Sequence, residues 1–283
     1  MNHLKTLFVL LVLSFALAPG ASATVLTVDC FFGPLYTIQD AVNASSTGDT
    51  IVVHPCSIAP FHYAEQVTIS GKSGLHLVGA EAPSAVGAYA SGAGTPPPSP
   101  PTIIDASGIG SCIVITGGSA DVSITGFDLY NCDGQGVVID NSKMIAVHAN
   151  RIVHALGGGI RDASNRARIT SNSILECYDY GIRLVGTNNA YIADNRIEVT
   201  NLWGIYVDGD YNHIVGNEII DTTLTGLNID TGQDNRIERN TIIGGATPRF
   251  LIGVGAVDTD AVGNSTGGSL SDMGTGTDLG DNS

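Results

Sequence analysis

Val147-His148-Ala149-Asn150-Arg151-Ile152 is the first clear copy of the phrase that decides the fold. The phrase has the form apolar-x-x-Asn-x-Ile. It returns so that its asparagines are spaced by 22 and 23 residues in alternation, at Asn150, Asn172, Asn195, Asn217 and Asn240. One period earlier, Ile124 to Leu129 fits the phrase with Phe127 in the asparagine place. A fixed period of this length is the signature of a repeat architecture.

A second phrase keeps the same period. In it a glycine precedes a branched apolar residue, at Gly136, Gly159, Gly181, Gly204 and Gly226. Each period therefore holds short, alternating, β-branched runs bounded by Asn and Gly, which predict strands and sharp turns. Glycine-free runs at 3.6 spacing, which helical repeats need, are absent. We predict one coil of a β-solenoid per period, with coils about 4.8 Å apart and asparagine amides hydrogen-bonded along the stack.

The segments on either side of the repeat extend this prediction. Thr37 to Val42 predicts a short amphipathic helix that caps the open edge of the first coil. Residues 24–81 hold this cap and the first coils, and the Pro-, Gly- and Ser-rich residues 82–101 predict a long loop. Coils then fill residues 102–262, and the polar residues 263–283 predict a loose tail.

The N-terminus and the composition point to export. Lys5, the apolar run Leu7 to Leu17 and the small residues Ala21-Ser22-Ala23 predict a secretory signal peptide over residues 1–23. The remaining 260 residues would carry 27 acidic against 11 basic residues, a formal charge of −16. Such a chain is a poor general binder of nucleic acid. We found no transmembrane segment beyond the signal peptide.

All five cysteines follow the predicted cleavage point, and export permits disulfides. The odd count leaves at least one thiol unpaired within the chain. Cys30 and Cys56 flank the predicted cap and are the favoured pair.

The opening phrases Tyr36-Thr37-Ile38-Gln39-Asp40-Ala41-Val42 and Gly48-Asp49-Thr50-Ile51-Val52-Val53, with the repeat, resemble the right-handed β-helix superfamily. That superfamily includes pectate lyases, mannuronan epimerases and NosD-like periplasmic proteins. The resemblance, over residues 36–245, implies an all-β, single-stranded, right-handed parallel β-helix. Tyr180-Gly181-Ile182 is similar to the start of the epimerase motif, but Arg183-Leu184-Val185 follows where that family has Asp-Pro-His-Asp. No complete catalytic motif carries over.

In a solenoid, residues one period apart form columns, and several columns carry chemistry between residues 154 and 211. The only tryptophan and five of the nine tyrosines lie in this stretch. Aromatic rings stack on sugars, and arginine binds carboxylates through two hydrogen bonds. The candidate substrate-binding residues are Tyr178, Tyr180, Trp203 and Tyr206. The candidate catalytic residues are His154, Arg161, Glu176, Asp179 and Arg183, with Glu176 and Asp179 also suited to Ca²⁺.

Asp162 stands out because alternation places it among inward apolar residues. A carboxylate there is costly without a partner. Either a local bulge turns Arg161 and Asp162 outward, which we favoured, or Asp162 is buried with a perturbed pKa.

Three functions fit these observations. The first is a secreted, periplasmic or cell-surface protein that binds a polysaccharide or surface glycan without a conventional catalytic motif. The second is a polysaccharide lyase or epimerase that acts on a uronate polymer. The third, implied by the resemblance alone, is a NosD-like periplasmic accessory protein.

Overall fold

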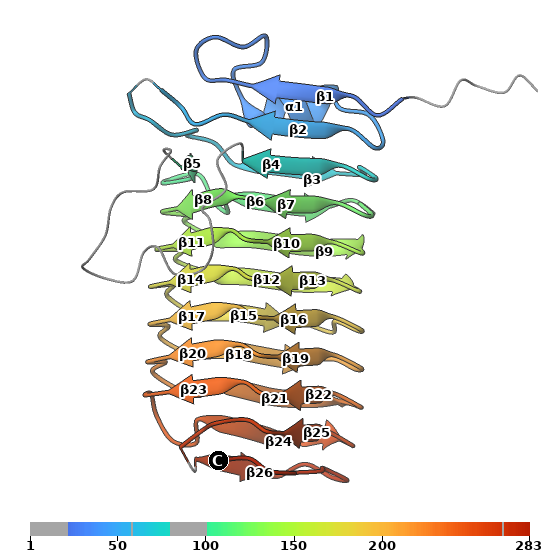
Figure 1. Cartoon of the computed structure of the whole chain (residues 1–283), viewed down its shortest axis with the longest axis vertical. Helices are drawn as coiled ribbons and strands as arrows, with labels where there is room; N and C mark the ends of the chain where they lie inside the picture. Colours follow the sequence, from blue (N-terminus) through green and yellow to red (C-terminus); the bar gives the residue numbers. More distant parts are fainter. Residues whose placement is uncertain (1–21, 58, 80–100, 268) are drawn as a thin grey trace, which may run out of the picture.

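The computed structural model describes residues 22–57, 59–79, 101–267 and 269–283. All its strand pairs are parallel and form three sheets, which we name A, B and C (Figure 1). Sheet A contains, in order, β1 (Val25–Val28), β2 (Thr50–Val53), β4 (His76–Gly79), β7 (Ser123–Thr125), β10 (Ala146–His148), β13 (Arg168–Thr170), β16 (Tyr191–Ala193), β19 (His213–Val215), β22 (Arg236–Glu238) and β25 (Asp260–Val262).

Sheet B contains β5 (Thr102–Asp105), β8 (Phe127–Tyr130), β11 (Arg151–Val153), β14 (Ser173–Leu175), β17 (Arg196–Glu198), β20 (Glu218–Ile220) and β23 (Thr241–Ile243). Sheet C contains β3 (Val67–Ser70), β6 (Ile113–Thr116), β9 (Gln135–Lys143), β12 (Gly158–Asn165), β15 (Tyr180–Leu184), β18 (Trp203–Asp208), β21 (Leu227–Gln233), β24 (Phe250–Val257) and β26 (Leu270–Asp272). From β7 to β25, each coil contributes one strand to each sheet, which confirms the predicted parallel β-helix.

The core is a set of stacked apolar columns. Ile174, Ile197 and Ile219 pair in register on neighbouring strands of sheet B, and all three are fully buried. Sheets A and C contribute equivalent columns, so the interior has one continuous apolar cluster. Burial of these columns, at about 25 cal/mol per Å² of apolar surface, is the main stabilising contribution.

The asparagine ladder forms as predicted, in the corner between sheets A and B. The Nδ2 of Asn172 donates to the Oδ1 of Asn195 at 3.0 Å, and the same oxygen accepts from the backbone N–H of Asn172 at 3.0 Å. The pattern repeats along the stack, and Phe127, in the asparagine place, donates its backbone N–H to Asn150. The amides therefore satisfy buried backbone groups where the chain turns.

The repeated asparagines of the first phrase and the glycines of the second do not themselves adopt the left-handed backbone of the turns. The left-handed residue of this corner precedes each asparagine: Ala149, Ser171, Asp194, Gly216 and Arg239 have φ between 50° and 65°. The glycines of the second phrase are needed for close approach instead. A Cβ added to Gly181 would lie 2.4 Å from Cγ2 of Ile197.

The side chains of Gln39 and Glu65 hold the N-terminal cap against the first coils. Helix α1 (Ile38–Ala44) begins after Thr37, and the carboxylate of Glu65 accepts the N–H groups of Ile38 and Gln39 at 2.8 and 2.9 Å. The side chain of Gln39 in turn hydrogen-bonds both backbone groups of Thr68 in β3. Gln39 thus takes the place of a neighbouring strand at the first coil of sheet C.

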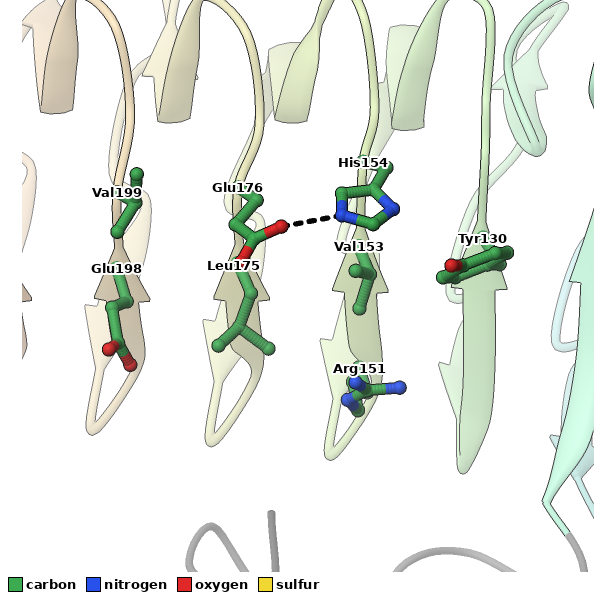
Figure 2. A pocket seen from close by; sticks show the side chains of 8 residues that line it. All are labelled: Tyr130, Arg151, Val153, His154, Leu175, Glu176, Glu198 and Val199. Atoms are coloured by element: carbon green, nitrogen blue, oxygen red, sulfur yellow. Dashed lines mark hydrogen bonds and ion pairs between the residues drawn. The ribbon is translucent and has the colours of Figure 1, made fainter. Parts of the chain in front are cut away.

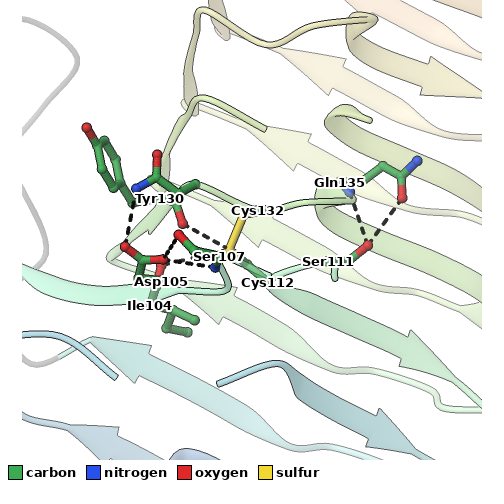
Figure 3. The surroundings of a disulfide bond; sticks show 9 residues. Ile104, Asp105, Ser107, Ser111, Cys112, Tyr130, Cys132 and Gln135 are labelled. Atoms are coloured by element: carbon green, nitrogen blue, oxygen red, sulfur yellow. Dashed lines mark hydrogen bonds between the residues drawn. A yellow bond between two sulfur atoms is a disulfide. The ribbon is translucent and has the colours of Figure 1, made fainter. Parts of the chain in front are cut away.

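Two disulfide bonds cross-link the chain. Cys30–Cys56, the favoured pair, closes the cap, and Cys112–Cys132 joins two consecutive turns between sheets B and C (Figure 3). Beside the second disulfide, the amide of Asn131 donates to Asp105 at 3.3 Å. Cys177 is the unpaired cysteine and is buried.

The C-terminal residues differ from the expected loose tail. β26 pairs with β24, and Asn264 and Asn282 continue the ladder. The segment 263–283 therefore adds to the solenoid. The expected signal peptide and loop fall almost entirely on residues 1–21 and 80–100, outside the described residues. The part of the chain that the structure describes contains no helix with the length and apolarity needed to cross a membrane.

Asp162 is buried, which corrects the favoured bulge. It pairs in register with Ile139 and Leu184 and has no exposed surface, and the register shift comes only after Ala163. The backbone N–H and the hydroxyl of Ser164 donate to its Oδ1 at 3.0 and 2.6 Å, whereas its Oδ2 has no partner among the described residues. Desolvation raises the pKa of Asp162 to about 6.

Candidate functional site

The outer surface of sheet C carries the predicted arginine column. Arg161 in β12 pairs in register with Arg183 in β15, which pairs with Tyr206 in β18. One column away, Tyr180 pairs with Trp203. We call these five residues the arginine–aromatic face.

Ring contacts hold Arg183 at the centre of this face. Its guanidinium lies 5.4 Å from the centroid of Tyr206 and 5.9 Å from that of Tyr180. The rings of Trp203 and Tyr206 are 4.9 Å apart and tilted by 48°. The side chains of neighbouring coils are therefore ordered by one another before any ligand arrives.

Neither Arg161 nor Arg183 forms an ion pair with a described residue, although the charge of Arg161 partly offsets the raised pKa of the neighbouring Asp162. Among the described residues, six ion pairs form, and neither Arg161 nor Arg183 takes part in one. The Nε of Arg183 is buried and has no hydrogen-bond partner among the described residues. Like charges directly opposite on neighbouring strands are destabilising. A chain with a formal charge of −15 thus carries two adjacent arginines without an ion-pair partner among the described residues.

The tyrosines of this face differ in what they offer. Tyr180 is 3% exposed and lies over Gly158, where an added Cβ would be 2.7 Å from its ring. Tyr180 was predicted to bind substrate through its ring. Because the ring is buried, Tyr180 supports Arg183 and is not free to stack on a sugar. Tyr206 is more open, and its hydroxyl donates to Asp230 at 2.6 Å. Desolvation, followed by Asp230, raises the pKa of Tyr206 to about 12.

Two other predicted residues, His154 and Glu176, lie beside sheet B. His154 and Glu176 follow β11 and β14 in left-handed turn positions, with φ of 56° and 51°. Their side chains meet at 2.5 Å between Nε2 and Oε2, and the ring of Tyr130 lies 5.3 Å from that of His154. Val199 is the equivalent residue in the next coil. His154, Glu176 and Val199 border a groove of about 280 Å³ (Figure 2).

The predicted single patch therefore separates into two groups. Arg161, Tyr180, Arg183, Trp203 and Tyr206 share the outer surface of sheet C, whereas His154 and Glu176 share the groove beside sheet B. Among the described residues, no ion pair or ring contact joins the two groups. Tyr178 and Asp179 lie in the turn between the sheets, and Tyr178 is 61% exposed.

The sequence analysis missed two supporting residues. Gln135 hydrogen-bonds the hydroxyl of Tyr180 from two coils away, and Asp230 holds Tyr206. Both lie in columns that the period defines. Gln135 could have been found as a polar residue in the column of Tyr180, two coils away. Asp230 could have been found as an acidic residue one coil from Tyr206, in a nearby column.

Within the described ranges, no three His, Cys, Asp or Glu side chains come close enough together to hold a metal ion. Glu176, a predicted Ca²⁺ ligand, is paired with His154 instead.

Sequence comparison agrees with this architecture. Residues 111–271 match the family model described as the right handed beta helix region. The chain belongs to the right-handed β-helix family. The match covers more than half of the chain and includes both groups of candidate residues. No curated protein matches the sequence of this β-helix.

Solved structures with a similar fold are distant in sequence. A DFA-IIIase from Arthrobacter chlorophenolicus A6, in complex with GF2, is 12% identical with a TM-score of 0.57, covering 90% of this chain and 83% of that one. An alginate lyase from Paenibacillus sp. FPU-7 is 12% identical with a TM-score of 0.50, covering 92% and 97%. The bacteriophage CBA120 tailspike protein 2 enzymatically active domain is 18% identical with a TM-score of 0.43, and the β-helix spans 33% of it. The likenesses to the DFA-IIIase and the alginate lyase agree with the fold.

Proposed function

We propose that this β-helix binds an acidic polysaccharide on the arginine–aromatic face of sheet C. The observation that carries the proposal is the pair Arg161 and Arg183. They lie side by side on neighbouring strands, and neither forms an ion pair with a described acidic residue. An anion placed between them would remove the repulsion and gain charge-assisted hydrogen bonds.

The spacing of the face suits a chain of sugars. Neighbouring strands are about 4.8 Å apart, so Arg161, Arg183 and Tyr206 cover about 10 Å along the solenoid. A uronate carboxylate would bind between the guanidiniums, and the next ring would rest on Trp203 and Tyr206. The structural neighbours whose names include a glycan, such as the alginate lyase, make this substrate class reasonable for the fold.

Two features support an extracellular or periplasmic setting. The disulfides Cys30–Cys56 and Cys112–Cys132 persist in oxidising compartments. The predicted signal peptide agrees with them. We therefore place the proposed glycan outside the cytoplasm, as a free polysaccharide or a surface glycan.

Binding assays with matched variants test the proposal. Polygalacturonate, alginate and chondroitin sulfate would be titrated with and without Ca²⁺ by isothermal titration calorimetry. The double variant Arg161→Gln/Arg183→Gln should weaken binding at least about tenfold, equivalent to about 1.4 kcal/mol. Arg168→Gln is the control, because Arg168 lies 4.7 Å over Tyr191 on sheet A, a similar pair on another surface. Equal loss in both variants, or no loss in either, contradicts the proposed face.

A lyase or epimerase acting on a uronate polymer is the second candidate. The arginines that would bind the carboxylate would also neutralise it, which favours proton loss from the adjacent carbon. Incubation with the same polymers distinguishes the two functions, since unsaturated-uronate absorbance reports a lyase and proton NMR reports epimerisation. The NosD-like accessory role stays a prediction from resemblance.

A further inference from the structure

We infer that the groove beside sheet B is a second saccharide site, and that it takes an uncharged pyranose ring. This sheet-B groove is lined by Tyr130, Arg151, Val153, His154, Leu175, Glu176, Glu198 and Val199. It lies on a different sheet from the arginine–aromatic face, and the inference does not depend on the function proposed for that face.

The floor of the groove is apolar. Tyr130, Val153 and Leu175 pair in register on β8, β11 and β14, and their side chains form one outward column that ends at Glu198 on β17. Val153 is only 5% exposed. A pyranose has a comparable apolar face of C–H groups, and an aromatic ring beside it favours stacking.

Polar groups border this floor on two sides. His154 and Glu176 stand in the turns that follow the strands, next to Val199, and Figure 2 shows them bonded to each other above Val153 and Leu175. Arg151 and Glu198 border the groove from the strands themselves. A sugar that rests on the floor would present its ring hydroxyls to both borders, where donors and acceptors are available.

The charges of the groove favour a neutral ligand. The charged groups that line it already have partners: Arg151 forms an ion pair with Asp128 at 3.2 Å, Glu198 forms one with Arg196 at 3.1 Å, and Glu176 is hydrogen-bonded to His154. A uronate placed here would meet two carboxylates and compete with existing pairs. This is the reverse of sheet C, where Arg161 and Arg183 form no ion pair with a described residue.

The volume indicates how much of a glycan fits. At about 280 Å³, the groove is at the lower limit of small-molecule pockets, which begin at about 300 Å³. One monosaccharide unit is therefore the expected occupant, with affinity in the millimolar range that small polar ligands reach in open sites.

Saturation-transfer NMR tests the inference with methyl β-D-glucopyranoside, methyl β-D-galactopyranoside and methyl α-L-rhamnopyranoside as probes. At least one should show saturable binding, and sodium galacturonate should not compete with it. Leu175→Arg, which fills the floor with a charged side chain, should weaken that binding about tenfold. Ile243→Arg is the control, because Ile243 lies in the same outward column three coils further and outside the groove.

A second variant guards against indirect effects. His154→Asn keeps a residue that tolerates the left-handed backbone and should weaken binding severalfold, because it removes the imidazole that pairs with Glu176. The Arg161→Gln/Arg183→Gln variant should bind the same probe unchanged, so that failure of the sheet-C proposal is seen separately. No saturable binding by any of the three glycosides, or equal loss in Leu175→Arg and Ile243→Arg, overturns the inference.

Discussion

The buried carboxylate of Asp162 predicts that this β-helix loses stability as the pH rises. Its pKa is raised from 3.8 to about 6, so the folded state binds a proton more tightly than the unfolded state does. Between these two values folding takes up a proton, and the free energy of unfolding therefore falls as pH increases. The contribution is absent at pH well below 4 and complete above the folded pKa.

The magnitude follows from the size of the pKa change. Each pKa unit corresponds to about 1.4 kcal/mol, so ionising Asp162 in the folded state costs about 3 kcal/mol. About 2 kcal/mol of this cost should appear between pH 4 and pH 7. The two hydrogen bonds from Ser164 reduce the cost but do not remove it, because Oδ2 has no partner among the described residues.

Asp162→Asn isolates this contribution, because asparagine keeps the oxygen that accepts from Ser164 but does not titrate. Urea unfolding, followed by circular dichroism, would be compared between the two proteins from pH 4 to pH 8. Relative to the native protein, the variant should gain about 2 kcal/mol across that range, whatever its stability at pH 4. A difference that stays constant with pH would refute the reasoning, and carboxyl ¹³C NMR of Asp162 would report its pKa directly.

Three further predictions concern the repeat itself. Asn195→Ala leaves the buried backbone N–H of Asn172 without its acceptor and should cost about 3 kcal/mol in urea unfolding; a loss below about 1 kcal/mol would contradict the ladder's importance. Ile197→Asp should abolish the folded β-type circular dichroism, since it buries a charge between two coils, whereas Ile220→Asp, in the outward column of the same sheet, should fold. Burial raises the pKa of the Cys177 thiol to about 12. Iodoacetamide should therefore label Cys177 only after unfolding in urea. Rapid labelling of the native protein would contradict this prediction.

The fold was predictable because each coil repeats the same physical requirements. Every copy of the first phrase supplies an inward isoleucine and an asparagine that satisfies the corner. The C-terminal segment escaped the pattern because its ladder spacing changes to 24 and then 18 residues, from Asn240 to Asn264 to Asn282. Ala261 also replaces the isoleucine of the inward column of sheet A. The backbone pairing continues there although the phrase no longer does.

The sequence predicts which residues share a column of the solenoid, but not which columns share one surface. Period alone places Arg161, Arg183 and Tyr206 in one column, and the register confirms it. Whether His154 shares that surface depends on where the chain turns between sheets B and C, and this corner is a matter of φ and ψ that spacing does not encode. Asp162 shows the opposite error, because side-chain chemistry favoured a bulge and the register of the sheet prevailed.

The uniform core makes departures on the outer columns informative. Inward positions are restricted to apolar residues by packing, whereas outward positions on the same strands are free to vary at little cost. Three of the eleven lysines and arginines among the described residues form ion pairs with acidic residues, and some of these pairs cross neighbouring coils, as Arg196 does with Glu218. Arg161 and Arg183 instead place two like charges opposite each other on neighbouring strands, in a protein whose other charges are mostly negative. A repulsive pair that packing does not require is more economically explained by an anionic partner than by stability, and for that reason sheet C is where an acidic ligand should be sought first.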